Sequence, residues 1–349
     1  MEIDKLIKID NIKNEVKRLH YISFIKFIAM ITIIKWHISK WIKPPIDYGA
    51  RMCELLFISS GFLVGYNYFR NPMKDNYCQS FNYAYKHLKA FYPFYLINTF
   101  IDIYIHSNIS INILTYIEIT IINILMLQSW SRYKFFVPCL NGHTWFLSVL
   151  LFCYYLSPLL LKGINNIKRA SIIYLIISLI RIFCEELISK GAINLFDADF
   201  HFGPIIRLLE YYMGMLTVPI YFFIRSFLDK YQNNKTYFKI FFTCIQISLP
   251  IIVYIIMFKY NYTFLRCYFA LIFSFFIIFI GLDYGYFSNI ISSKMFQIIM
   301  NCQIEMYLLQ LNVNHYINLL LMKKDTKNRL IIELEFAFKL IIIFIHFQI

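Results

Sequence analysis

The sequence predicts an all-α, polytopic bundle of transmembrane helices. Of its 349 residues, 59% are hydrophobic and 15% are charged, whereas a typical soluble domain has about 25% charged residues. Apolar runs near membrane-spanning length recur along the whole chain, as in 238–258 and 264–282. These runs are continuous, and strands of a transmembrane barrel would alternate between apolar and polar residues. The composition therefore favours helices and leaves no room for a separate soluble domain.

Ten apolar segments have about the length of a transmembrane helix. They are 22–42, 51–69, 88–105, 111–128, 144–162, 170–188, 204–224, 238–258, 264–282 and 295–322. An eleventh stretch, 330–347, is long enough to span, to lie in the interface or to pack as a final helix. We therefore expect about ten spans, or eleven, in one membrane-embedded domain over residues 21–347.

The charge distribution predicts how the chain is oriented. Residues 1–20 are basic and contain no cleavable signal peptide, which predicts a cytoplasmic N-terminus ahead of a retained first span. The net charge of +14 has the same origin, because lysine and arginine keep loops in the cytoplasm. No nucleic-acid partner is expected, since no soluble fold displays a basic patch. The basic residues of 162–169 and 225–239 would lie outside by simple alternation, which leaves the topology of the middle loops open.

Cysteine usage indicates neither a metal site nor a redox motif. The eight cysteines are scattered, and no two form a C-x-x-C pair. Most lie in apolar runs, where a thiol behaves as a small hydrophobic group. We expect no metal ion and no permanently bound cofactor.

Lys26 and His37 are ionisable groups inside the first span. Such residues are costly in a membrane and usually face a bundle interior, where they mark a functional site. They are eleven positions apart, close to three helical turns at about 3.6 residues per turn. They therefore share one stripe of the helix, roughly 16 Å apart along its axis. A lone histidine in a span can also be a structural polar group.

Further polar groups interrupt or border the later spans. They are Ser59, Ser60 and Gly61 in the second span, Lys86 and Lys89 before the third, His143 and Trp145 at the fifth, and Arg207 and Glu210 in the seventh. Serine and glycine in a membrane helix usually permit close packing, and tryptophan at a span's start is a common interfacial anchor. Arg207 and Glu210 have the spacing of an ion pair, and we expect that pair to be structural.

The order of these motifs resembles the acyltransferase 3 family of integral membrane proteins. That family has an arginine and a histidine in its first span at the spacing of Lys26 and His37. The family's next elements are matched by Phe-x-x-Ser-Gly-Phe at 57–62, by the basic segment with Lys86, Lys89 and Pro93, and by Trp-Phe-Leu at 145–147 with Pro158. Its aromatic–Gly-Met element is matched at 210–215, and its late Tyr-Leu element at 306–310. The resemblance covers residues 18 to 345. Ser23, Lys26 and Gln310 stand where the family usually has an acidic residue, an arginine and a histidine.

The resemblance implies transfer of an acyl group, commonly acetyl, from acetyl-CoA or another acyl-CoA to a carbohydrate hydroxyl. The acceptor would be a cell-surface polysaccharide or a glycolipid, and the location the bacterial cytoplasmic membrane. His37 would be the catalytic base, since neutral imidazole can take a hydroxyl proton near pH 7. Lys26, Lys86, Lys89, Ser60 and Gly61 would bind the donor. Trp145 and His143 would bind the acceptor.

Two other functions fit the same polar residues. A transporter or flippase of a polar or lipid-linked substrate would also carry polar groups in its spans, although it would more often show paired, broken helices in two related halves. An inactive structural partner in envelope-polysaccharide assembly would be consistent with Ser23, Lys26 and Gln310.

Overall fold

The helical class predicted from the sequence is confirmed by a computed structural model. It describes residues 19–39, 48–70, 77–105, 112–130, 144–189, 203–230, 235–260, 267–301 and 303–308. Every regular element within these residues is a helix. The basic N-terminal segment, most of the span expected at 295–322 and the stretch 330–347 lie outside the described residues.

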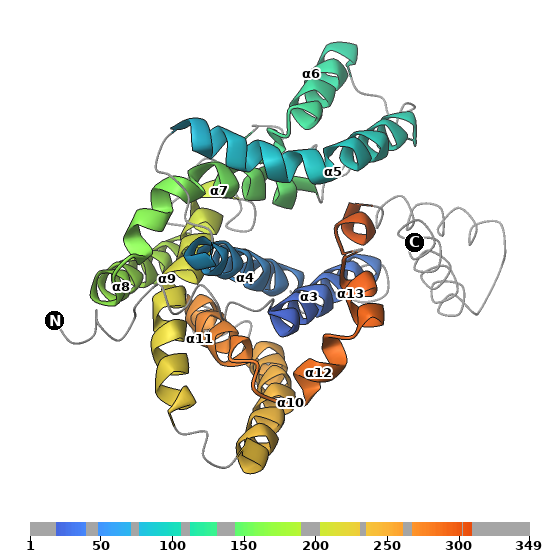
Figure 1. Ribbon diagram of the computed structural model, residues 1–349. Coiled ribbons are helices and arrows are strands. Elements are labelled where there is room, and N and C mark those ends of the chain that lie inside the picture. Colours follow the sequence, from blue (N-terminus) through green and yellow to red (C-terminus); the bar gives the residue numbers. More distant parts are fainter. Residues whose placement is uncertain are drawn as a thin grey trace. The chain divides into compact units, whose positions relative to one another are not determined.

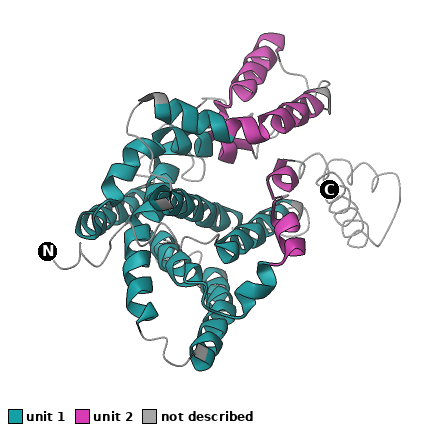
Figure 2. Ribbon diagram, in the orientation of Figure 1, with its two compact units in different colours: residues 1–87, 149–292 teal, residues 88–148, 293–349 magenta. Residues whose placement is uncertain are grey.

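The chain forms two compact units, coloured separately in Figure 2. Unit 1 contains Met1–His87 and Val149–Ser292, and unit 2 contains Leu88–Ser148 and Ser293–Ile349. Helices α5 (Tyr77–Ile105) and α7 (Trp145–Leu160) contribute residues to both units. Each unit is assembled from two separated stretches of chain, so the single domain expected over 21–347 stays a prediction.

Helix α4 (Tyr48–Arg70) is the centre of unit 1 (Figure 1). Every residue from 51 to 62 is buried, because α3, α9 and α11 all pack against this helix. The remaining helices of unit 1 are α3 (His20–Ser39), η4 (Leu161–Ile164), α8 (Ile167–Ser189), α9 (Pro204–Asp229), α10 (Lys235–Tyr260), α11 (Phe269–Gly281) and α12 (Phe287–Ile291).

The backbones of α4 and α9 touch where two glycines cross. A Cβ atom on Gly61 would lie 1.8 Å from the carbonyl oxygen of Tyr211, and one on Gly214 would lie 1.9 Å from that of Ile58. Small residues allow membrane helices to approach this closely. The expected packing role is therefore confirmed for Gly61, and Gly214 is its counterpart on α9.

Contacts in unit 1 also show which helix ends lie together. Gly281, at the end of α11, lies close to Ile22 near the start of α3 and to Tyr221 in the second half of α9. The end of α9 therefore lies on the same side of unit 1 as the start of α3. Simple alternation of ten spans would put those ends on opposite sides. The basic residues of 225–239 thus follow an end of α9 that lies beside the start of α3, on the side where the positive-inside rule would put them if the N-terminus is cytoplasmic. The sides of the other middle loops and the orientation of the N-terminus stay predictions.

Helices α8 and α10 turn apolar side chains outward. On α8, Ile172, Leu175, Leu179 and Phe183 are exposed, whereas Arg181 is fully buried. This pattern is inverted relative to a soluble protein and suits a lipid surrounding. Among the described residues, two helical segments are long and apolar enough to cross a membrane, Trp145–Ile164 and Thr236–Met257. The expected count of about ten spans stays a prediction.

In unit 2, polar side chains satisfy the backbone around a sharp turn. This unit includes α6 (Ile113–Ile124), η1 (Gln128–Trp130) and α13 (Lys294–Asn301). After α6, Met126 has a left-handed backbone with φ of 55°, and Ser148 Oγ donates to its carbonyl oxygen at 2.6 Å. Tyr95 donates to the carbonyl oxygen of Asn123 at 2.6 Å. These bonds fix the connection between α6 and η1.

We predict that Gly214→Ala destabilises the protein strongly. The added methyl group would overlap a backbone carbonyl that no side-chain movement can relieve, so a loss near 3 kcal/mol in the free energy of unfolding is expected. Denaturant titration of the purified protein in detergent measures it. Gly203→Ala is the matched control, because a Cβ atom there has its nearest neighbour at 3.8 Å. Equal stability of the two variants would contradict the backbone contact.

Candidate functional site

Lys26 and His37 lie on the inward side of α3. The helix is continuous from His20 to Ser39, so the eleven-residue spacing puts both residues on one stripe. This stripe borders the buried residues Ile22, Ala29 and Ile33. The exposed residues of α3 are on the opposite side of the helix. Both ionisable side chains are half-buried, as expected for polar groups at the edge of a membrane-protein interior.

His37 occupies the last turn of α3. The indole of Trp36 contacts the imidazole edge-on, with ring centroids 4.5 Å apart. Trp36 itself packs against Gly49 in the first turn of α4, where a Cβ atom would lie 2.8 Å from the indole ring. The start of α4 therefore fixes the ring next to His37.

The charge of Lys26 acts on a second histidine that the sequence motifs did not single out. His87 lies on α5 just before the span expected at 88–105, and the charges of Lys86 and Lys26 both act on its imidazole. Burial, with a smaller contribution from these two charges, lowers the pKa of His87 to about 4. Among the described residues, no carboxylate forms an ion pair with Lys26.

The other expected donor-binding residues have different surroundings. Lys86 and Lys89 are exposed on α5, Lys86 in unit 1 and Lys89 in unit 2. Ser60 is buried, and its hydroxyl has no hydrogen-bond partner among the described residues. Gly61 is covered by the backbone of α9. Donor binding by these four residues stays a prediction, and for Gly61 the contact with α9 already explains the residue type.

Of the two expected acceptor-binding residues, His143 lies outside the described residues. Trp145 begins α7 and is only 4% exposed. Its carbonyl oxygen accepts a hydrogen bond of 2.9 Å from Ser129. Acceptor binding by Trp145 stays a prediction.

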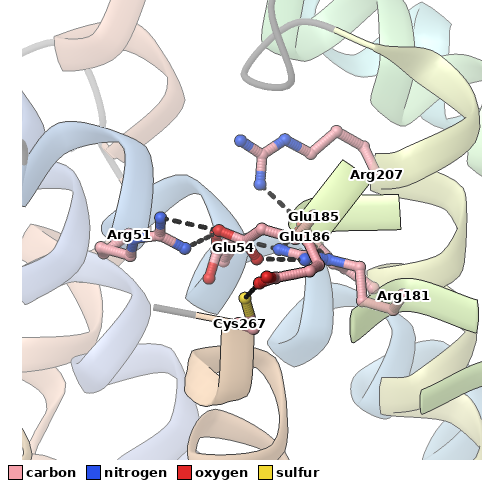
Figure 3. A network of polar contacts seen from close by, with 8 residues as sticks. Arg51, Glu54, Arg181, Glu185, Glu186, Arg207 and Cys267 are labelled. Carbon is pink, nitrogen blue, oxygen red and sulfur yellow. Dashed lines mark hydrogen bonds and ion pairs between the residues drawn. The ribbon is translucent and has the colours of Figure 1, made fainter. Parts of the chain in front are cut away.

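The ion pair expected between Arg207 and Glu210 is present and belongs to a larger network (Figure 3). Arg207 Nη1 lies 2.7 Å from Glu210 Oε2, and the other carboxylate oxygen of Glu210 lies 2.9 Å from Arg181 Nη2. Arg181 also pairs with Glu185 and, at 3.2 Å, with Glu54. The network thus connects α9, α8 and α4.

Arg51 completes the network at the start of α4. It pairs with Glu54 one turn along the same helix and, at 3.1 Å, with Glu185 on α8. Its guanidinium also lies 5.3 Å from the ring centroid of Phe269 on α11. The three arginines and three glutamates have balanced charges, and all six side chains are at most 3% exposed. Oε2 of Glu54 has no hydrogen-bond partner among the described residues.

Sequence reasoning found only one pair of this network. The missed signal was a repeated spacing: Arg51 precedes Glu54 by three positions, as Arg207 precedes Glu210. Arg181 and Glu185 are four apart inside another apolar run. Both spacings place opposite charges on one helix face. The spacing along the chain does not indicate that these three pairs contact one another across the helices.

The helices of the described residues, their outward apolar faces and the buried charges are typical of an integral membrane protein with a charged network in its apolar interior. A family model described as an acyltransferase domain matches residues 19–345. The chain therefore belongs to the acyltransferase 3 family, whose members are membrane proteins. No curated protein and no solved structure with which the chain was compared matches it.

We predict that Arg181→Met destabilises the protein by about 3–5 kcal/mol, because it leaves buried carboxylates without their partner. Thermal and denaturant unfolding in detergent measure the loss. Asp229→Asn is the control, since the ion pair of Asp229 with Arg225 is 4.0 Å long and half-exposed and should contribute less than about 1 kcal/mol. Similar stability of both variants would mean that the network does not hold α8 to α4 and α9.

Proposed function

We propose that this protein transfers an acyl group, in the simplest case acetyl, from an acyl-CoA to a hydroxyl group of a cell-surface or lipid-linked carbohydrate. Acyl transfer itself follows from membership of the acyltransferase 3 family. The site is assigned from one observation, the inward stripe of α3 on which Lys26 and His37 lie. It presents a cation and an imidazole, both half-buried, on one face of a continuous helix.

The positions of Lys26 and His37 suit donor binding near one end of α3 and proton transfer from the acceptor at the other end. Lys26 lies in the first half of α3 and His37 in its last turn. With the N-terminus in the cytoplasm, the donor's phosphates would meet Lys26 first, and the acceptor would reach His37 from the other side. Lysine would act on phosphate as a point charge, without the planar fork of the arginine usual in the family.

His37 can serve as a general base and then as a general acid. The neutral imidazole takes the proton of the acceptor hydroxyl while its oxygen attacks the thioester carbonyl. The carbon–sulfur bond breaks, an ester forms, and the imidazolium returns its proton to the departing thiolate. No proton is gained or lost overall. Direct, transient acylation of the imidazole is a second route to the same products.

His37→Ala is expected to reduce acyl transfer by at least about 100-fold, because a positioned general acid–base typically contributes 10²–10⁴-fold. The assay is mass spectrometry of ester-linked acyl groups on surface glycans, with the protein level in membranes measured alongside. The control is Lys168→Ala, which removes an exposed cation of α8. Normal glycan acylation in the His37→Ala strain would refute the catalytic assignment.

Lys26→Ala is expected to raise the dissociation constant of acetyl-CoA, whereas Lys26→Arg should keep or improve the affinity. A charged hydrogen bond to phosphate is worth roughly tenfold or more in binding. Equilibrium binding of radiolabelled acetyl-CoA to the purified protein distinguishes the two variants. If the alanine variant binds acetyl-CoA as tightly as the unaltered protein, Lys26 has no role in donor binding.

A deletion strain separates the enzyme from the other two functions. Loss of an ester-linked acyl group from an otherwise intact polymer supports the acyltransferase. Loss of the whole polymer supports export or assembly instead.

A further inference from the structure

Arg225, one turn before the end of α9, has a largely covered guanidinium with few partners. Its side chain is 21% exposed. Among the described residues it makes one hydrogen bond of normal length, from Nη1 to the hydroxyl oxygen of Tyr221 at 2.8 Å. Its Nε lies 4.0 Å from Oδ2 of Asp229, which is beyond hydrogen-bonding distance. Because a guanidinium has five N–H donors in a planar fork, most of the hydrogen-bonding capacity of Arg225 is unused.

Another guanidinium of unit 1 is satisfied much more fully. Arg181 donates hydrogen bonds from all three of its nitrogens to carboxylates of the buried network. The carboxylate of Asp229 is engaged elsewhere, because its Oδ1 accepts a hydrogen bond of 2.5 Å from the hydroxyl of Tyr284. Arg225 is therefore an oriented cation that no carboxylate of the described residues contacts at hydrogen-bonding distance.

The hydroxyl that orients Arg225 belongs to a packed aromatic cluster. Tyr221 is fully buried, and the rings of Phe62 and Tyr66 on α4 lie 5.4 and 5.8 Å from its own, measured between centroids. Both rings meet Tyr221 edge-on, a favourable arrangement that fixes the position of its hydroxyl oxygen. The guanidinium is thus held on a rigid support, in contrast to the exposed Lys230 at the end of the same helix.

Arg225 lies on the side of unit 1 where α3 begins, beyond Lys26. A Cβ atom on Gly281 would lie 3.3 Å from Ile22 and 3.5 Å from Tyr221, so these two side chains are at one level of the unit. The contacts of α4 with both helices show that α3 and α9 run in opposite directions. Lys26 and Arg225 each lie four residues further along their helices, on opposite sides of this level. They are therefore about two turns apart, roughly 12 Å along the helix axes.

This arrangement suits a ligand with two separate phosphate groups. The arginine fork can bind two oxygens of one phosphate, whereas a lysine acts as a point charge. Coenzyme A has a diphosphate within its chain and a phosphate monoester on its ribose, both far from the thioester. In the proposed reaction the thioester lies at His37, so the donor would extend past Lys26, and its terminal phosphate monoester would lie nearest to Arg225.

We propose that Arg225, oriented by Tyr221, binds a phosphate monoester at the end of α9. The ligand is the 3′-phosphate of the acyl-CoA donor, and this identification rests on the proposed function. The headgroup of phosphatidic acid has the same chemistry and is the other source of such a group. The phosphate site itself rests on the fixed guanidinium, its unused donors and the distance of Asp229.

Equilibrium binding to the purified full-length protein in detergent tests the proposal. The probes are acetyl-CoA, acetyl-dephospho-CoA, which lacks only the 3′-phosphate, and a short-chain phosphatidic acid. Arg225→Gln should weaken acetyl-CoA binding about tenfold and leave the affinity for acetyl-dephospho-CoA unchanged, because either change removes the same interaction. Arg225→Lys keeps the charge and should lose less. Lys230→Gln is the matched control, since it removes an exposed cation from the same helix end.

Asp229→Asn separates a binding role of Arg225 from a structural ion pair. If Arg225 served only to pair with Asp229, Arg225→Gln and Asp229→Asn would have the same effect. A phosphate-binding Arg225 predicts that Asp229→Asn binds acetyl-CoA as tightly as the unaltered protein or more tightly, because a competing negative charge is removed. Thermal unfolding of every variant separates lost binding from lost structure.

Weaker acetyl-CoA binding in Arg225→Gln, with acetyl-dephospho-CoA unaffected, supports the donor as the ligand, and weaker binding of phosphatidic acid alone supports a lipid headgroup. Equal affinities of Arg225→Gln and the unaltered protein for all three probes would overturn the proposal. Equal losses for both CoA compounds would do the same, as would an unaltered protein that binds no probe. If Arg225→Gln weakens acetyl-CoA binding but no carbohydrate is acylated, the phosphate site stands and the proposed function fails.

Discussion

The contact between the backbones of α4 and α9 is the constraint on which the rest of unit 1 depends. Gly61 and Gly214 have no side chains to separate the helices, so each faces a carbonyl oxygen of the other helix. Helices that cross so closely must also bring together the side chains on the neighbouring turns. Glu54 and Glu210 lie on those turns, and Arg181 of α8 reaches both. The glycine contact thus sets the spacing within which six buried charges can neutralise one another.

The buried network specifies how α4, α8 and α9 pack against one another, although burying its charges costs solvation free energy. Three guanidinium groups and three carboxylates would each be expensive to bury alone, and in a membrane no water is available to compensate. Their mutual pairing makes the arrangement of α4, α8 and α9 nearly all-or-none, since removing one member leaves another charge without its partner. Arg51, at the start of α4, belongs to this network, and Gly49, two positions before it, contacts Trp36, the neighbour of His37. The candidate base therefore stands beside a rigid helix end.

Particular residues show how far the sequence could lead. Lys26 and His37 were recognisable because charge is rare in an apolar run and because their spacing fits a helix. Arg207 and Glu210 were recognisable as a pair for the same reason. Arg51, Glu54, Arg181 and Glu185 have comparable spacings, but which pairs meet across helices depends on how the helices cross, and local periodicity contains no such information. His87 was hidden among the basic residues of 85–89, because only the tertiary structure brings Tyr154 to stack on it.

The sequence by itself determined the helical class, the apolar runs, the inward stripe of α3 and, through its ordered motifs, the family. These properties depend on composition and on spacing along the chain, which a helix converts directly into faces. Only the tertiary structure decided that α9 ends beside the start of α3, that the charged pairs merge into one network, and that His87 packs against Tyr83 and Tyr154. The reason is physical: such contacts join residues far apart in the chain, and they exist only once the helices have packed.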